Sequence, residues 1–248
     1  MDENLQGEIY TFVMRWRRLV DALSTEQRTA MRDANLGYML HIPPIMIRST
    51  LIRYMIEMYD VPKQRFVIQE NTGEVRVAGE DVEAIFGLKD GGISAMDILF
   101  EEGETIVDNI PKEYLSKVSG NLVIDDMIDE IAKNPTADDA FLRRATLVLI
   151  GTIFAPRAKK VVDRQYYALV KYVGRIKEIN WNAFTRWILH EELKRVLSGR
   201  YLKQWPGANM ALLQVYIRFG ISYLFLHCHY NCVKIMYCFL CSTYIGRR

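Results

Sequence analysis

A helical apolar stripe near the N-terminus constrains the fold most, because several later segments repeat its period. Apolar residues recur at steps of three and four between residues 9 and 23, the spacing of one face of an α-helix. The stripe consists of Ile9, Phe12, Val13, Trp16, Leu19, Val20 and Leu23. The arginines at positions 15, 17 and 18 fall mostly outside it. We therefore expect this helix to bury one face against others.

Further helices are expected between capping residues and prolines. Ser24 and Gln27 form a capping-box pattern, and Pro44 can occupy the first position of a helix. Residues 94–119 are weakly patterned, so we expect a loop there with one or two helical turns. The expected helices cover residues 25–34, 45 to about 59, 79–86, 123–133, 138–150, 161–173 and 181–197, with another beginning after Gly207.

One short region has β character. Arg65–Gln69 and Glu74–Ala78 flank residues 70–73, whose sequence ENTG is typical of a hairpin turn. The buried side of this hairpin is expected to carry Val67, Val75 and Val77. The predicted fold class is therefore mainly α, a multi-helix globular domain with one small β-hairpin at about residues 65–78.

Composition supports a folded chain with a sizeable core. Half of the 248 residues are hydrophobic and 25% are charged, which excludes a disordered or collagen-like chain. The formal net charge is only +2, so attraction to nucleic acid is not a property of the whole molecule. However, residues 79–139 carry sixteen Asp and Glu against four Lys, and residues 143–177 carry nine Lys and Arg against one Asp. These blocks either meet in the fold or present opposite faces to different partners; the favoured interpretation is that both are mainly solvated faces.

The basic block is a candidate contact patch. Its predicted contact residues are Arg157, Lys159, Lys160, Arg164, Lys171, Arg175 and Lys177. Tyr166, Tyr167 and Tyr172 are interleaved with these charges, an arrangement that suits phosphate contacts and base stacking. The alternative is that the tyrosines belong to the core.

The sequence contains no complete catalytic or cofactor motif, so we expect no enzyme and no cofactor. Glycine-rich phosphate loops, dinucleotide-binding turns and serine nucleophile elbows are missing. His190 begins the sequence HEELK, in which Lys194 replaces the second histidine of a zinc protease motif. Acidic residues at 125, 126, 129 and 130 share helical spacing. They could bind a divalent ion, but a solvated acidic face is the favoured interpretation.

All the cysteines lie near the C-terminus, at positions 228, 232, 238 and 241, with histidines at 227 and 229. The central spacing is shorter than that of a zinc ribbon or finger, and apolar residues fill the gaps. We therefore predict no metal site and, because the context indicates an intracellular protein, reduced thiols.

The C-terminal segment differs in character from the rest of the chain. We predict two parts, a helical domain at residues 1–217 and a divergent, apolar, cysteine-rich tail at residues 218–248. The tail is long enough to cross a bilayer, although Lys234 and polar residues oppose insertion. The alternatives are a helix that completes the core or docks on a partner. The candidate anchor residues are Phe219, Leu224, Phe225, Leu226, Ile235, Phe239 and Leu240.

An ordered set of motifs resembles the plant mobile domain, also called the aminotransferase-like plant mobile domain, in its transposon-associated grass form. The resemblance covers about residues 10–217. The motifs are LVDALSTEQR at 19–28, LGYML at 36–40, EDVEAIFGLKDGG at 80–92, NWNAF at 180–184 and PGANMALLQVY at 206–216. Lys89 departs from the pattern, which usually has proline there, and the chain leaves the pattern after Tyr216.

The resemblance implies a non-enzymatic plant protein of transposon-derived origin that acts through protein–protein contacts. It brings no pyridoxal site, since no phosphate-binding glycine loop accompanies a candidate lysine. Two alternatives remain open: a tail-anchored or membrane-associated, cytotoxic effector at a mitochondrion or other organelle, and a nuclear nucleic-acid-binding protein in silencing or genome maintenance. We expect an intracellular, non-secreted protein of the nucleus or cytoplasm, because Asp2 and Glu3 have the wrong charge for a secretory signal.

Overall fold

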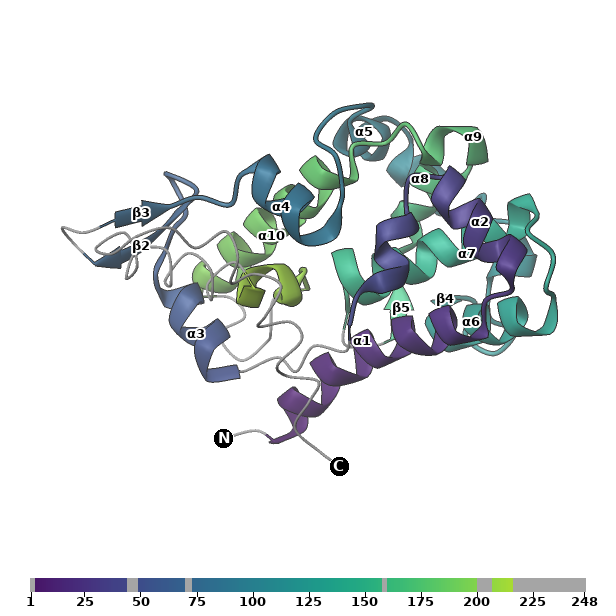
Figure 1. Ribbon diagram of the computed structural model, residues 1–248, viewed down its shortest axis with the longest axis horizontal. Coiled ribbons are helices and arrows are strands. Elements are labelled where there is room, and N and C mark those ends of the chain that lie inside the picture. Colours follow the sequence, from purple (N-terminus) through teal and green to yellow (C-terminus); the bar gives the residue numbers. More distant parts are fainter. Residues whose placement is uncertain (1–2, 44–48, 70–72, 158–159, 200–206, 216–248) are drawn as a thin grey trace.

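The computed structural model describes residues 3–43, 49–69, 73–157, 160–199 and 207–215, and these are mainly helical (Figure 1). The α-helices are α1 (Glu3–Ala22), α2 (Thr25–Asp33), α3 (Ser49–Glu57), α4 (Gly79–Phe86), α5 (Ala95–Ile106), α6 (Ile124–Lys133), α7 (Asp139–Leu149), α8 (Tyr167–Val170), α9 (Val173–Ile176) and α10 (Trp181–Leu197). Shorter helical segments are η1 (Gly37–His41), η2 (Lys112–Tyr114), the π-helical η3 (Ile150–Phe154) and η4 (Arg164–Tyr166). Residues 210–215 are also helical.

Two small antiparallel sheets accompany the helices. The first has the strand order β1 (Tyr59–Asp60), β2 (Arg65–Gln69), β3 (Gly73–Val75), with Phe66 opposite both Tyr59 and Val75. The second pairs β4 (Leu122–Val123) with β5 (Val161–Val162). The predicted class, mainly α with a small hairpin, is confirmed.

The helices pack around one hydrophobic core. In Figure 1, α1 runs along one side of the molecule, α3 and the β2–β3 hairpin lie at one end, and α2, α6 and α7 gather at the other. Helix α1 contacts α6, α7 and η3, while α10 contacts α3, α4, α5 and η3. The indole N–H of Trp16, which is buried, donates to the carbonyl oxygen of Met39 at 2.8 Å and so joins α1 to η1.

Local sequence signals explain several helix boundaries. The Ser24 hydroxyl accepts from the Gln27 amide N–H at 3.1 Å, and the Gln27 side chain accepts from the Ser24 N–H at 3.0 Å, which is the predicted capping box. The amide group of Gln27 also donates to the carbonyl oxygens of Asn134 and Thr136. The cap therefore also joins α2 to the segment between α6 and α7.

Residues 94–119 contain more helix than the sequence predicted. Instead of one or two turns in a loop, α5 has 12 residues. Ser94 caps it by accepting from the Asp97 N–H at 3.2 Å. The buried face includes Ala95, Ile98 and Ile106 together with Gly103. Because two of these residues are small, the apolar stripe is weak in sequence although the helical spacing is present.

The single helix predicted for residues 161–173 is wrong. The segment contains β5, then η4 and the four-residue α8. Val161 and Val162 pair with β4, and the Asp163 carboxylate begins η4 by accepting from the Gln165 N–H at 3.3 Å. Residues 166–170 are all buried, so the segment lacks the polar face of a surface helix.

The hairpin region differs from the prediction in two details. Helix α3 ends at Glu57, so Tyr59, which was expected at its end, lies in β1. Phe66, only 1% exposed, is the buried residue of β2, whereas Val67 is partly buried. Val77 packs against the core as expected. The side chain of Val75, residues 70–72 and the expected start of α3 at Pro44 lie outside the description.

Candidate functional site

Three segments far apart in the sequence meet at a surface groove of about 910 Å³. They are residues 32–41 from the end of α2 through η1, residues 87–93 between α4 and α5, and residues 177–181 between α9 and α10. Helices α4, α5 and α9, which flank the last two segments, lie in the upper part of Figure 1. We refer to this hollow as the 32/87/177 groove.

The wall formed by residues 87–93 is fixed from below by a buried asparagine. The side-chain amide of Asn182, in α10, donates to the carbonyl oxygen of Leu88 at 2.7 Å and to that of Gly79 at 2.8 Å. Its oxygen accepts from the Arg186 Nε–H at 3.0 Å. Because Asn182 is fully buried, these bonds are shielded from water and hold both ends of α4 on α10.

The same wall is joined to the residues before α10 by backbone hydrogen bonds. The Ile93 N–H donates to the Glu178 carbonyl oxygen at 2.7 Å, and the Asn180 N–H donates to the Ile93 carbonyl oxygen at 2.8 Å. Gly92 has φ +109°, and a Cβ atom there would lie 2.2 Å from the Glu178 oxygen. Glycine is therefore required for this approach. The Asp90 carboxylate accepts from Asn180 at 2.9 Å and from Arg186 at 2.7 Å.

The segment of residues 32–41 contributes an exposed aromatic ring to the groove. Tyr38 is 68% exposed, and its ring lies directly over Gly87, where a Cβ atom would be 2.2 Å from the ring carbon Cγ. Gly87 also ends α4 in the left-handed conformation, with φ +65°. The Asn35 side chain donates to the Lys177 carbonyl oxygen at 3.0 Å and joins this wall to the third segment. Ile93, 39% exposed, adds an apolar side chain.

The groove carries uncompensated positive charge. Arg32, Lys89 and Lys177 line it, and none of them has an ion pair among the residues that the structure describes. Of the two lining carboxylates, Asp90 is paired with Arg186, which leaves Glu178 as the negative group. The arrangement suits noncovalent binding: a preformed backbone, an exposed aromatic ring and cations.

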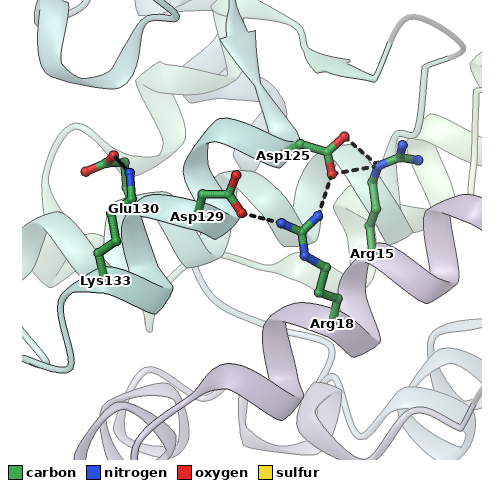
Figure 2. Close-up of polar contacts among 6 residues, drawn as sticks. All are labelled: Arg15, Arg18, Asp125, Asp129, Glu130 and Lys133. Carbon is green, nitrogen blue, oxygen red and sulfur yellow. Dashed lines mark hydrogen bonds and ion pairs between the residues drawn. The ribbon is translucent and has the colours of Figure 1, made fainter.

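The acidic residues of α6, which the sequence offered as ion ligands, instead contact arginines of α1. Figure 2 shows Arg15 and Arg18 pointing toward the carboxylates. The Arg15 Nε–H lies 3.1 and 3.2 Å from the two Asp125 oxygens, and Arg18 donates to Asp125 at 3.2 Å and to Asp129. Arg15 is buried, so it is an exception to the expectation that these arginines lie outside the apolar stripe. The charges therefore join α1 to α6.

The last carboxylate in Figure 2, Glu130, pairs with Lys133 on the same helix at 2.8 Å. This hydrogen bond lowers the pKa of Glu130. Within the described part of the chain, no group of three His, Cys, Asp or Glu side chains is placed to hold a metal ion.

Members of the predicted basic patch have different surroundings. Arg157 pairs with Asp163 at 2.7 Å, while Lys171 and Arg175 both pair with Glu102 at 3.1 and 3.4 Å. The hydrogen bond to Glu102 raises the pKa of Lys171. The acidic and basic blocks thus meet at Glu102. Lys160 is exposed and Lys177 lines the groove, whereas Arg164 is partly buried in η4 and Lys159 lies outside the description.

The interleaved tyrosines are divided between core and surface. Tyr166 and Tyr167 are buried in the core, and burial raises the pKa of each to about 12. They have no free ring face for base stacking. Tyr172 is exposed and lies beneath the charges of Lys171 and Arg175, whose charged atoms are 5.0 and 4.9 Å from the ring centroid.

His190 has a structural environment. Its Nδ1 atom lies 2.8 Å from the Tyr59 hydroxyl, and its Nε2 atom lies 3.4 Å from the Gln64 amide nitrogen. Burial raises the pKa of Tyr59 to about 12. Glu192, two positions later, accepts from the Gly207 N–H at 2.7 Å. The HEELK segment thus joins α10 to the strands and to the chain near residue 207.

The cysteines, both neighbouring histidines and the seven candidate anchor residues lie in 216–248, outside the described residues. Among the helices that are described, none combines the length and the apolar character needed to cross a membrane.

Sequence reasoning did not identify the groove as a site. The motifs at 36–40, 80–92 and 180–184 were recognised only as family-like segments, although they supply parts of all three walls. Gly87 and Gly92, where the structure has close approaches, are the sequence signal that bears on the groove. Nothing in one sequence indicated that these three segments would meet.

The fold and the groove define a mainly helical domain with a preformed surface hollow. The chain belongs to the family described as a domain of unknown function (DUF8566), whose model matches residues 13–212. All three wall segments lie inside this range. Comparisons with curated proteins and with solved structures give no match.

Proposed function

We propose that this domain is a non-enzymatic protein-interaction module whose 32/87/177 groove binds an extended segment of a partner protein. The observation that carries the proposal is the prior fixation of the groove. Asn182 and the Ile93–Glu178 and Asn180–Ile93 hydrogen bonds hold its backbone before any ligand arrives. A preformed site binds with a smaller loss of conformational entropy.

The surfaces of the groove suit a peptide. Tyrosine supplies a large contact area with few rotatable bonds, and Tyr38 is held in place by its contact with Gly87. The peptide N–H groups of residues 89–92 have no acceptor among the described residues. In this proposal, those that face the groove donate to carbonyl groups of the extended ligand, which is a recurrent way of capturing peptides.

The sequence resemblance supports the same proposal. Plant mobile domain proteins are implied to act through protein partners, and three of the motifs that carry the resemblance supply groove residues. We accordingly propose a transposon-derived plant protein of the nucleus or cytoplasm.

Selection from a random peptide display library tests the proposal. Twelve-residue peptides selected on the full chain should lose about tenfold or more in affinity when Tyr38→Ala removes the exposed ring, since aromatic anchors often dominate such interfaces. Phe100→Ala is the matched control, because Phe100 is 92% exposed and does not line the groove. It should change affinity less than about twofold. Selected peptides that bind both variants as tightly as the unchanged protein would refute the proposal.

A further inference from the structure

The charge of the groove identifies the class of segment that it binds. On the basis of the proposed function, we infer that the partner segment is acidic. Its Asp or Glu carboxylates pair with Arg32, Lys89 and Lys177. Apolar side chains between these carboxylates contact Tyr38 and Ile93.

This inference depends on a difference between the groove's aspartate, which is paired within the chain, and its three cations, which are not. Arg186 pairs with one carboxylate oxygen of Asp90, and the Asn180 side chain donates to the other oxygen of Asp90. The three lining cations have no such partners within the described chain, and each comes from a different segment of the groove. Their side chains therefore surround the hollow, and a segment with several carboxylates can reach more than one of them.

The chain itself does not supply an obvious ligand at its C-terminal end. Residues 216–248 contain Arg218, Lys234, Arg247 and Arg248 and no Asp or Glu. A positively charged segment is repelled by the groove cations. Residues 216–248 are therefore not the acidic occupant, and we assign the groove to a segment of a partner protein.

Nucleic acid fits this groove less well. Single-stranded nucleic acid is usually held by a track of aromatic rings along a basic channel. Here two exposed rings, Tyr38 and His41, come from one short segment rather than forming a track, and Glu178 adds a negative charge to the lining. Farther along the basic block, Arg157, Lys171 and Arg175 are already paired with carboxylates.

The expected contribution of charge follows from the exposure of these side chains. Exposed ion pairs typically change an equilibrium constant by about twofold to fivefold each. Three pairs together should favour an acidic peptide over its neutral counterpart by about tenfold. The preference should decrease strongly between low salt and 0.5 M salt, because ions screen exposed charges.

The test uses the full chain and a synthetic library of twelve-residue peptides in three versions. Each peptide carries four Glu, four Gln or four Lys at the same positions, on an otherwise identical apolar and polar background. We expect the Glu version to bind about tenfold more tightly than the Gln version and the Lys version to bind least. Single-stranded DNA of random sequence is added as a competitor in a separate arm.

Charge variants identify the surface responsible. The double variant Lys89→Gln and Lys177→Gln should reduce the preference for Glu to less than about threefold. The control, Lys112→Gln with Lys117→Gln, makes the same change at exposed lysines outside the groove and should leave the preference unchanged. Replacing Lys89 and Lys177 with Glu should shift the preference to the Lys peptides, a result that loss of folding cannot produce.

The outcomes separate this inference from the proposed function. Equal binding of Glu and Gln peptides that is lost in Tyr38→Ala would overturn the acidic class and leave peptide binding intact. If every peptide version bound and no groove substitution changed the binding, both the acidic inference and the proposed function would be overturned. DNA binding that depends on Lys89 and Lys177, without a preference for Glu peptides, would overturn the acidic inference in favour of nucleic acid.

Discussion

The buried side chain of Asn182 offers the most direct test of how the groove is held. Asn182→Ala removes the donor that the Leu88 and Gly79 carbonyl oxygens share, at 2.7 and 2.8 Å. It also removes the acceptor of the Arg186 Nε–H. Arg186 retains its contact with Asp90, so the two carbonyl groups account for most of the loss.

The magnitude follows from the burial of these groups. A buried polar group that loses its partner costs about 1–3 kcal/mol, and two such groups therefore cost about 2–6 kcal/mol before relaxation. Alanine is a better helix former than asparagine by about 0.5 kcal/mol. We expect the free energy of unfolding to fall by about 3 kcal/mol, which corresponds to a decrease in Tm of roughly 6–12 °C for a chain of this size.

Urea denaturation followed by circular dichroism measures this change, with Asn109→Ala as the matched control. The Asn109 amide also donates to a backbone carbonyl, that of Thr105 at 2.8 Å, but the residue is exposed. Its loss should cost less than about 1 kcal/mol. If Asn182→Ala and Asn109→Ala gave the same small loss, the argument that buried hydrogen bonds hold the groove wall would be wrong.

Two further predictions concern ionisable groups. The pKa of Tyr166 is raised to about 12 by burial from about 10 in the unfolded chain, so the free energy of unfolding should fall as pH rises from 10 to 12. In base titrations, Tyr166→Phe should remove up to about 2–3 kcal/mol of that fall; a Tyr166→Phe curve that falls as steeply as that of the unchanged protein would contradict the assignment. Asp125→Asn replaces the carboxylate that buried Arg15 and Arg18 both contact and should cost about 1–2 kcal/mol in urea denaturation. Exposed Asp126→Asn should cost less than about 0.5 kcal/mol, and a similar loss in both variants would exclude an energetic role for the α1–α6 ion pairs.

The predictable parts of this fold are those that depend on neighbouring residues. The capping box at Ser24, the left-handed Gly87 after α4 and the helix that Asn180 caps are all encoded within a few positions. Such signals act before tertiary packing and can be read from one sequence. They give the helical class and several helix boundaries.

The missed parts depend on contacts between distant residues. The face of α5 that includes Ala95 and Gly103 can be recognised as a buried face only once α8 and η4 pack against it. Val161 and Val162 form a strand because they pair with β4, which lies about forty residues earlier in the sequence. The groove was missed for the same reason, because Asn182 and Leu88 become partners only in the assembled fold.

The origin of the groove walls in distant parts of the chain also determines when the groove can form during synthesis. The first wall is complete at residue 41, but the last requires residues 177–181, and the Asn182 bonds come later still. A growing chain therefore cannot present the hollow until most of the domain has left the ribosome. Under the proposed function, capture of a partner reports that all three wall segments have come together.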